Sequence, residues 1–511
     1  MKGKNKQNFS KSVLALILAQ LILLASCGQE ASSDDTTATT GSVTGESTDA
    51  VAEQPHYLTL EADFGGKTFT MLGVASKEHP FFQNFEIYVE EENGDVVNDA
   101  VFQRNQIIEE KYNVTIKQDL VETPNAANNT AIFKRIQTEI MTNDKTFDAF
   151  FIPSRDAALV MQSDYCANLL DIDSIDMTES YWNQVMAEAL TINDELLLAS
   201  SDFSLVDKKR TYIVSYNREL LSTLSDADLP DMVREGTWTF DNFNKLASLA
   251  SRDLDGNGEY DWKDQWGIGM GAQNDVALFY AAMGGRVVEA DKDGTPIIVA
   301  DNERNTNIAE IIYRAFMETQ TTAFNAKQNR VQTWIGSGCP VAAPTSVASY
   351  LFQNGRSLFS CAVVQSLPSY SDVEGLDYGI VPFPKYDEQQ KDYYTLFETW
   401  GALLMGIPVT SDDPEFPGFM LEVLSGYSTD TSYKAYVETA SKIKYIYDED
   451  SAEMLDIVYK GLMVDVGVMY NFGGIFNPIA DLMLAPSFNY ASRYAAIKDA
   501  AQAAMDEVYG G

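Results

Sequence analysis

The amino-acid sequence predicts an α/β protein of two lobes, in each of which a mixed sheet is flanked by helices. Strand and helix patterns alternate at the start of the body, which is typical of a sheet covered by helices on both faces. Strand patterns then return after a helix-rich middle, so strands near both ends of the chain flank helices. The 511 residues are 45% hydrophobic and 11% aromatic, enough apolar surface for roughly two to four domains.

The amino terminus has the pattern of an export signal. Four lysines precede an apolar run at 13–25, which is shorter than the ~20 residues needed to span a membrane. The run ends in the letters LASC, which resemble the lipobox of bacterial lipoproteins. The resemblance implies that residues 1–26 are a cleaved signal peptide, that Cys27 carries the lipid, and that the protein is anchored at the extracytoplasmic face of the membrane. An ordinary secretory signal followed by a chance cysteine is the alternative.

Residues 27–55 differ in composition from the rest of the chain. They are rich in Ser, Thr, Gly and acidic residues, and Val43 and Val51 are their only larger aliphatic residues. Such a segment cannot bury enough apolar surface to fold, so we predict a flexible acidic tether between the lipid and the body.

Three cysteines remain in the body, namely Cys166, Cys339 and Cys361. An odd number cannot pair completely, and no CxxC spacing occurs. We expect three buried free thiols, with a Cys339–Cys361 disulfide as the alternative.

The alternating segments come first in the body. An apolar strand is predicted at 66–76, followed by an amphipathic helix at 98–112. A second strand begins at 113, a second helix covers 129–143, and a short, almost wholly apolar strand covers 148–153.

The later segments complete the two-lobe prediction. Residues 196–216 have the pattern of two strands around a polar bend, and helices dominate 217–350. Strand patterns return at 357–365, 376–383 and 402–408, and helices fill most of the remainder. This order predicts several chain crossings between the lobes.

Several segments resemble the extracellular solute-binding proteins of ABC transporters, in the sugar-binding group that includes maltose-binding protein. The likeness covers about 56–511. The segments that carry it are 94–114 (GDVVNDAVFQRNQIIEEKYNV), 237–249 (TWTFDNFNKLASL), 253–267 (DLDGNGEYDWKDQWG), 352–359 (FQNGRSLF), 377–386 (DYGIVPFPKY) and 441–471.

The resemblance implies a periplasmic-binding-protein (Venus-flytrap) fold, in which two α/β lobes joined by hinge crossings close on a ligand. It places lobe 1 at 56–205 and 353–398, and lobe 2 at 206–352 and 399–511. Ligand binding would shift an open–closed equilibrium, and the closed form would dock on the permease.

The composition and the motifs exclude several classes of function. With 75 acidic and 36 basic residues, the formal charge of −39 lacks the basic footprint of a nucleic-acid binder. His56 and His79 are the only histidines, so a zinc HExxH motif or a Ser-His-Asp triad is hard to build. No GxxxxGK[ST] phosphate loop occurs. The paired carboxylates of a glycoside hydrolase stay open, because so many acids make accidental pairs.

An acidic loop at 253–264 has the spacing of an EF-hand calcium loop. Oxygen-bearing side chains fall at loop positions 1, 3, 5, 9 and 12, and Gly258 at position 6 permits the sharp turn. Position 12 is Asp264 instead of the usual Glu, which shortens its reach and lowers the expected affinity. We predict a structural Ca²⁺ site, with a plain acidic turn as the alternative. The predicted ligands are Asp253, Asp255, Asn257, Glu259 (through its carbonyl), Asp261 and Asp264.

Sugar-binding residues are sought among aromatic and polar side chains. Flat rings cover the apolar C–H faces of a sugar, while carboxylates, amides and arginines bond its hydroxyls. The first candidate is Trp400, at a predicted crossing, with Glu398 beside it. For every candidate a place in the core or on the solvated surface is the alternative. The other candidates, placed by the resemblance in interlobe loops, are Tyr181, Trp182, Trp334, Asp202 and Arg155.

Trp238 is left out of that set because of its local pattern. Thr239 is a good N-cap residue, which makes Trp238 the residue before the cap and Phe243 the fourth residue of the helix. This is the spacing of a hydrophobic staple, so we predict a structural role.

The sequence therefore predicts a lipid-anchored receptor that performs no bond chemistry. It would bind a carbohydrate, most simply an oligosaccharide, between its lobes and deliver it to the permease subunits of an ABC importer. We expect a monomer that binds no nucleic acid, and its acidity favours a neutral ligand. Two alternatives stay open: a surface glycoside hydrolase or other carbohydrate-active enzyme, and a receptor for a peptide or another solute.

Overall fold

The structure is a computed structural model that describes most of the chain from Gln54 onward. The chain divides after residue 53, and everything described here belongs to the second unit, Gln54–Gly511. The predicted signal peptide, Cys27 and nearly all of the tether lie outside the described residues. These are 54–77, 83–123, 130–271, 275–292, 295–324, 334–341, 346–399, 401–438, 446 and 448–509.

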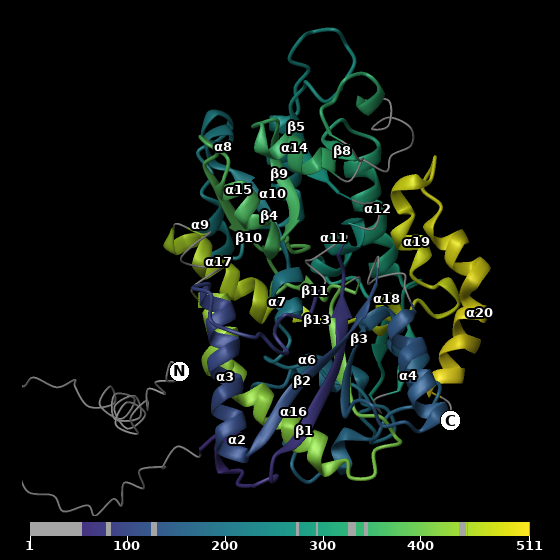
Figure 1. Ribbon diagram of the computed structural model, residues 1–511. Coiled ribbons are helices and arrows are strands. Elements are labelled where there is room, and N and C mark those ends of the chain that lie inside the picture. The colour runs from purple at the N-terminus through teal and green to yellow at the C-terminus, as the bar shows by residue number, and fades with distance from the viewer. Residues whose placement is uncertain are drawn as a thin grey trace, which may run out of the picture. The chain divides into compact units, whose positions relative to one another are not determined.

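Lobe 1 is built around a four-stranded sheet with the strand order β12-β3-β1-β2 (Figure 1). β1 pairs in parallel with β2 and β3, whereas β12 pairs with β3 in the antiparallel direction. All five residues of β3 are buried, which explains its continuous apolar sequence AFFIP. The strands are β1 (Lys67–Ala75), β2 (Val114–Glu122), β3 (Ala149–Pro153) and β12 (Leu403–Gly406).

The helices of lobe 1 start and stop at residues that cap them. α3 (Val96–Tyr112) follows Asp95, whose carboxylate accepts hydrogen bonds from the backbone N–H groups of Val97 and Asn98. It ends at Asn113, which adopts the left-handed conformation. The other helical segments are α2 (His56–Thr59), α4 (Ala131–Thr142), η2 (Ser154–Asp156), α5 (Ala157–Met161), η3 (Leu169–Asp171), α6 (Gln184–Leu190) and α16 (Glu415–Ser428).

Lobe 2 contains a five-stranded mixed sheet with the order β10-β4-β9-β5-β8. Its central strand β9 pairs antiparallel with β4 and parallel with β5. A separate two-stranded hairpin joins β6 and β7. The strands are β4 (Tyr212–Asn217), β5 (Trp266–Met270), β6 (Val288–Ala290), β7 (Pro296–Ile298), β8 (Thr322–Phe324), β9 (Ser357–Val363) and β10 (Tyr378–Val381).

The cap predicted for the helix after Trp238 is confirmed. α10 (Phe240–Ala250) starts at Thr239, whose hydroxyl accepts a hydrogen bond from the backbone N–H of Asn242. The buried rings of Trp238 and Phe243 lie edge to face with centroids 6.1 Å apart, as in a staple. The other helical segments of lobe 2 are α8 (Arg218–Leu224), α9 (Leu229–Arg234), α11 (Val276–Ala282), α12 (Glu303–Met317), α14 (Val347–Gln353), η6 (Val364–Ser366), α15 (Leu367–Ser371), α17 (Glu449–Lys460), α18 (Val466–Tyr470), η9 (Phe472–Gly474), α19 (Asn477–Ala480), η10 (Leu482–Leu484) and α20 (Tyr490–Tyr509).

Between its described residues, the chain passes from one lobe to the other three times. The first passage runs from Ala199, which is bridged to β12, through α7 (Leu205–Arg210) into β4. The second runs from β10 back to β12, and the third runs from α16 through η7 (Thr429–Tyr433) to α17, which packs on β10. Beside these passages, β11 (Thr395–Leu396) pairs in parallel with β13 (Leu462–Met463).

Three strands belong to the other lobe than the one predicted for them. The strands expected in lobe 1 near 357 and 376 are β9 and β10, and both belong to the lobe 2 sheet. The strand expected in lobe 2 near 402 is β12, which pairs with β3 of lobe 1. The second passage therefore lies between Val381 and Leu403. An apolar pattern indicates that a strand exists but not which sheet it joins.

Two further predictions were tested by the structure. The two strands predicted over 196–216 are replaced by the helix α7 followed by one strand, because the basic residues that end α7 suit a helix C-terminus. The three free thiols are confirmed, although Cys361 is only half-buried. In the part of the chain that is described, no helix is both long and apolar enough to cross a membrane.

Candidate functional site

The strand ends of both sheets meet the chain passages at one junction. In lobe 1, β3 is followed by η2, which packs against α18 and whose Ser154 hydroxyl donates to the carbonyl of Thr399. In lobe 2, β9 is followed by η6, whose first N–H, at Val364, donates to the carbonyl of Thr211 in the first passage. Ligands of open α/β sheets bind outside the carboxyl ends of strands, so this junction is the candidate site. Residues 272–274 and 400, which adjoin it in sequence, lie outside the described residues.

Glu398 is the centre of the hydrogen bonds between the first and second passages. Its Oε1 accepts hydrogen bonds from Arg210 Nη2 at 2.9 Å and from the Tyr212 hydroxyl at 3.4 Å. Its Oε2 accepts from the backbone N–H groups of Gly401 at 2.6 Å and Ala402 at 3.1 Å. Because Glu398 is buried and both of its oxygens are occupied, its observed role is to hold the two passages together. Contact of Glu398 with a sugar stays a prediction.

Arg155 and Asp156 lie in η2, directly after β3. Arg155 is partly exposed, as a ligand-binding residue must be, whereas Asp156 is buried. Burial raises the pKa of Asp156 to about 6, against a smaller opposing effect of the Arg155 charge. Asp156 Oδ2 is buried without a hydrogen-bond partner. A buried oxygen of this kind is a place for a donor that the protein does not itself supply.

Asp202 connects the first passage with the third. Its Oδ2 accepts a hydrogen bond from the Thr429 hydroxyl at 2.9 Å, and its backbone N–H donates to the carbonyl of Tyr181. Burial raises the pKa of Asp202 to about 6, and the nearby charge of Lys208 partly opposes this effect. This position agrees with the interlobe segment in which the resemblance places Asp202.

Tyr181 and Trp182 are packed inside lobe 1, where their polar atoms are already bonded. The Tyr181 hydroxyl and Trp182 Nε1 both donate to the carboxylate of Glu422 in α16, the latter at 2.9 Å. Trp182 is 1% exposed, so its ring offers no open face for stacking on a sugar. In this structure both side chains support the lobe.

The structure tests the predicted sugar contact for Trp334 but not for Trp400. Trp334 belongs to a small second core of lobe 2, where its ring centroid lies 5.5 Å from that of Trp266. Trp334 is 4% exposed, so it lies in the core, which was the alternative to sugar contact. Trp400, the first candidate for a sugar platform, lies outside the described residues, and its role stays a prediction.

The sequence analysis missed Arg210, Tyr212 and Gln365. Arg210 and Tyr212 bond Glu398, as described above, while Gln365 lies in η6 and its Oε1 is buried without a hydrogen-bond partner. The signal for Gln365 was available: it is the second residue after an apolar strand, as Arg155 is after β3. Arg210 gave no such signal, because it ends a basic run that reads equally well as a solvated surface.

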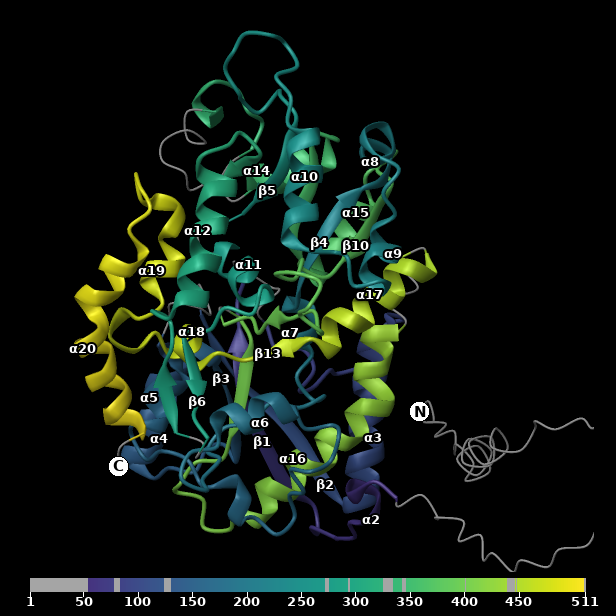
Figure 2. The same cartoon turned by 180° about the vertical axis from the view of Figure 1, so that it is seen from behind.

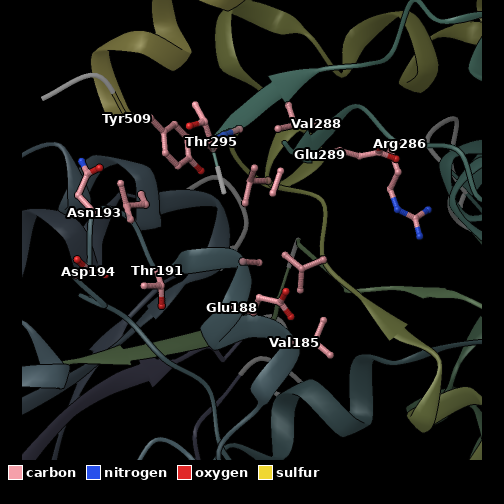
Figure 3. A pocket seen from close by; sticks show the side chains of 16 residues that line it. Val185, Glu188, Thr191, Asn193, Asp194, Arg286, Val288, Glu289, Thr295 and Tyr509 are labelled. Carbon is pink, nitrogen blue, oxygen red and sulfur yellow. The ribbon is translucent and has the colours of Figure 1, made fainter. Parts of the chain in front are cut away.

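Two cavities lie between α6 of lobe 1 and segments of lobe 2. The larger, of about 670 Å³, faces the β6–β7 hairpin and the end of α20 (Figure 3). The smaller, of about 240 Å³, is lined by three of the predicted residues, Tyr181, Trp182 and Asp202, together with Lys208 and Tyr433. Both cavities share the wall residue Val185, so they adjoin each other along α6.

The acidic loop brings some of its predicted ligands together. Carboxylate oxygens of Asp253, Asp255 and Asp264 lie within 4.8 Å of one another. Asp264 is fully buried, and its two oxygens accept hydrogen bonds from the N–H groups of Leu254 at 2.9 Å and Asp261 at 2.7 Å. The Asp261 carboxylate instead accepts from the Lys263 N–H, and the Asn257 side chain bonds within the loop.

The loop lies against the second core of lobe 2. Trp266 Nε1 donates to the carbonyl of Asp261 at 2.9 Å, and the Tyr260 ring centroid lies 5.4 Å from that of Trp266. The shape of the loop is therefore connected to the packing of the core beneath it.

Comparisons with known proteins identify the fold. No family model matches the sequence, and no curated protein matches it. Among solved structures, UspC of M. tuberculosis is similar at 13% identity and a TM-score of 0.53, over 86% of this chain and 100% of that chain. A cyclo/maltodextrin-binding protein complexed with maltotetraose is similar at 13% identity and 0.53, over 86% and 97%. UgpB of Mycobacterium tuberculosis, in complex with glycerophosphocholine, is similar at 12% identity and 0.53, over 86% and 98%.

These likenesses confirm the predicted two-lobed periplasmic-binding-protein fold. Each of them extends over nearly the whole of the other chain, so both lobes take part.

Proposed function

We propose that the protein is a solute-binding receptor that holds a sugar at the interlobe junction and delivers it to the permease of an ABC importer. The observation that supports this most directly is a pair of buried, unpartnered oxygens, Asp156 Oδ2 after β3 and Gln365 Oε1 after β9. One belongs to each lobe, and each calls for a hydrogen-bond donor. Sugar hydroxyls are such donors, and a ligand that bonds both residues stabilises the closed arrangement of the lobes.

The charges at the junction suit a neutral ligand. Arg210 is paired with Glu398 at 2.9 Å, and Arg155 is followed directly by the acidic Asp156, so each arginine has an acid close by. The protein as a whole, with its formal charge of −39, repels anions as well. A binding site for neutral hydroxyl groups fits this balance better than a phosphate or carboxylate site.

The proposal is tested by thermal-shift and calorimetric measurements with a panel of oligosaccharides. A true ligand raises the melting temperature and binds with a stoichiometry of one, and it is recovered unchanged. Gln365→Leu removes an acceptor and weakens binding by about tenfold, the effect of losing one buried hydrogen bond. Gln389→Leu, on an exposed turn, is the control. Absence of binding by any glycan in the panel would overturn the proposal.

Two alternatives give different outcomes in the same experiments. A glycoside hydrolase would return a cleaved glycan instead of the intact ligand. A receptor for another class of solute would respond to that solute and to no sugar. Glycerophosphocholine and short peptides belong in the panel for this reason, the first because UgpB binds it.

We propose that Cys27 carries the lipid that anchors the protein at the extracytoplasmic face of the membrane, with residues 28–55 as the tether. The support is the LASC sequence after the apolar run. Cys27→Ala should move the protein from the membrane fraction into the soluble fraction and abolish its labelling by radioactive palmitate. Unchanged membrane association would contradict a lipid anchor. We also propose that the receptor acts as a monomer.

We propose that the loop 253–264 binds Ca²⁺ as a structural clip of lobe 2. The three clustered carboxylates supply hard oxygen ligands, and a cation would neutralise the fully buried Asp264. Chelation should lower the melting temperature, and Asp255→Ala should remove this sensitivity, while Asp372→Ala, an exposed control, should retain it. A melting temperature that does not respond to chelator or to added calcium would reject the clip.

A further inference from the structure

The larger cavity beside α6 has the features of a second binding site. Its volume of about 670 Å³ falls within the roughly 300–1,000 Å³ range of small-molecule pockets. Its lining contains none of the junction residues named above, although it meets the junction at α18, whose first residue is Val466. We propose that this pocket binds a small organic cation, meaning a solute with an ammonium group on a short apolar or hydroxylated body.

The pocket lies between elements of both lobes. One wall is α6 and the turn that follows it, around Asn193 and Asp194. The opposite wall is the β6–β7 hairpin, the segment with Val464 and Val466, and Tyr509 at the end of α20. Figure 2 shows the hairpin reaching from lobe 2 past α18 toward α6. A molecule in the pocket therefore contacts both lobes.

The free charges of the pocket are negative. Glu188 projects from α6, Asp194 from the following turn and Glu289 from the hairpin, all exposed to solvent. Among the described residues, no lysine or arginine is paired with any of these three carboxylates. Carboxylates on the walls of a concave site attract cations, because the low-dielectric walls concentrate their field.

The one arginine in the lining is occupied elsewhere. Arg286 Nη1 donates to the carbonyls of Gly285 at 2.8 Å and Ala281 at 3.2 Å. Its guanidinium also lies 4.8 Å from the ring centroid of Tyr394. Figure 3 shows Arg286 at the edge of the pocket away from Tyr509. The guanidinium keeps its charge, but three carboxylates against one arginine leave the lining with a net charge of −2.

Apolar surface and the hydroxyl of Tyr509 complete the site. Val185, Val288 and Val466 offer contacts for a hydrocarbon body. The Tyr509 hydroxyl is buried and has no hydrogen-bond partner, so it can bond a polar group of the solute. An anion is disfavoured by three unpaired carboxylates, and a neutral solute would leave them without a counter-charge.

The test titrates choline into the whole protein at about 20 mM salt, where surface charges are weakly screened. The uncharged analogue 3,3-dimethyl-1-butanol, which has the same shape, is titrated in parallel. The test variant is Glu188→Gln combined with Glu289→Gln. The control combines Glu195→Gln with Glu235→Gln, which removes the same charge from exposed positions outside the lining.

We expect choline to bind with a stoichiometry of one and the uncharged analogue to bind at least about tenfold more weakly. The test variant should lose at least about tenfold in choline affinity, and the control should stay within twofold to threefold of the native protein. Equal loss in both variants would mean attraction to the general surface charge and would overturn the proposal. Equal binding of the two probes, or no binding of choline, would overturn it as well. The measurement uses no sugar, so its outcome is independent of the proposed receptor function.

Discussion

Glu422 explains why aromatic residues predicted for the ligand belong to the core instead. This carboxylate accepts hydrogen bonds from the Tyr181 hydroxyl, from Trp182 Nε1 and from His56 Nδ1, the last at 2.9 Å. Tyr181 and Trp182 precede Glu422 by about 240 residues, so no local pattern relates them. The sequence of a tyrosine–tryptophan pair after an acidic stretch is the same whether the two side chains contact a sugar or a buried carboxylate.

Replacing Glu422 by Leu should destabilise the protein strongly. The substitution leaves the buried Tyr181 hydroxyl and Trp182 Nε1, and the partly exposed His56, without their acceptor. Each buried donor left unsatisfied lowers the free energy of unfolding by about 1–3 kcal/mol. Urea denaturation followed by tryptophan fluorescence measures the effect. Glu422→Gln, which keeps one acceptor oxygen, should have a smaller effect. A loss below about 1 kcal/mol for the leucine variant would show that the donors find other partners.

Asp207, in α7, should make stability depend on pH. Burial raises its pKa to about 7, although the Ser200 hydroxyl and the Leu403 N–H donate to its oxygens. In the unfolded chain its pKa is near the ordinary value of about 3.9. Between these values the folded protein holds a proton that the unfolded chain releases, so the free energy of unfolding falls as pH rises from about 4 to about 7.

Asp207→Asn should flatten this part of the pH dependence and make the protein relatively more stable above pH ~7. Chemical denaturation at several pH values between about 4.5 and 8 measures both effects. Asp372→Asn, at an exposed position, should leave the native slope unchanged. Asp156 and Asp202 have pKa values raised to about 6, so part of the slope should remain in the Asp207 variant.

The sequence analysis named Arg155, which follows an apolar strand, and Glu398, which lies at a predicted crossing. Whether either of them contacts a ligand stays a prediction. Arg210 and Tyr212 were missed because their role depends on bonds to Glu398, about 190 residues later in the chain. Side chains that act through distant partners carry no signature in their own segment.

At the scale of elements, local patterns located most of the first lobe. β1, α3, β2, α4 and β3 begin and end close to their predicted bounds, because alternating or helical apolar spacing and capping residues act within a few positions. The lobes predicted for the strands β9, β10 and β12 were wrong, because strand pairing joins segments that are far apart in sequence. The seam between α10 and β5, which follow each other in the chain, shows how closely a helix packs on the sheet.

Gly267 in β5 has no room for a side chain. A Cβ atom there would lie 2.4 Å from the backbone carbonyl oxygen of Ala247 in α10, and backbone cannot move aside as a side chain can. Gly267→Ala should lower the free energy of unfolding by about 1–3 kcal/mol, as overpacking does. Gly336→Ala, where a Cβ would meet nothing within 4 Å, is the matched control. Equal stability of the two variants would mean that α10 shifts freely on the sheet.

At the scale of the whole molecule, the formal charge of −39 should make stability depend on salt. Like charges on a compact surface repel one another, and the repulsion weakens as salt shortens the screening length. Raising NaCl from about 20 to about 200 mM should raise the melting temperature by at least about 2 °C, which is roughly 2 kcal/mol for a chain of this size. EDTA should be present throughout, so that no divalent ion acts at the 253–264 loop. A constant or falling melting temperature would show that the acids are locally compensated.

The pairing of β12 with β3 also governs when the chain can fold during its synthesis. β3 ends at Pro153 and its edge partner begins at Leu403, about 250 residues later. At roughly 5–20 residues per second, a ribosome takes about 12–50 s to add them, and during this time one edge of β3 has no strand beside it. Unpaired apolar edges invite association between chains. A nascent chain of this topology therefore needs either a chaperone or export in the unfolded state, and truncation before residue 403 should give an aggregating product instead of a soluble lobe.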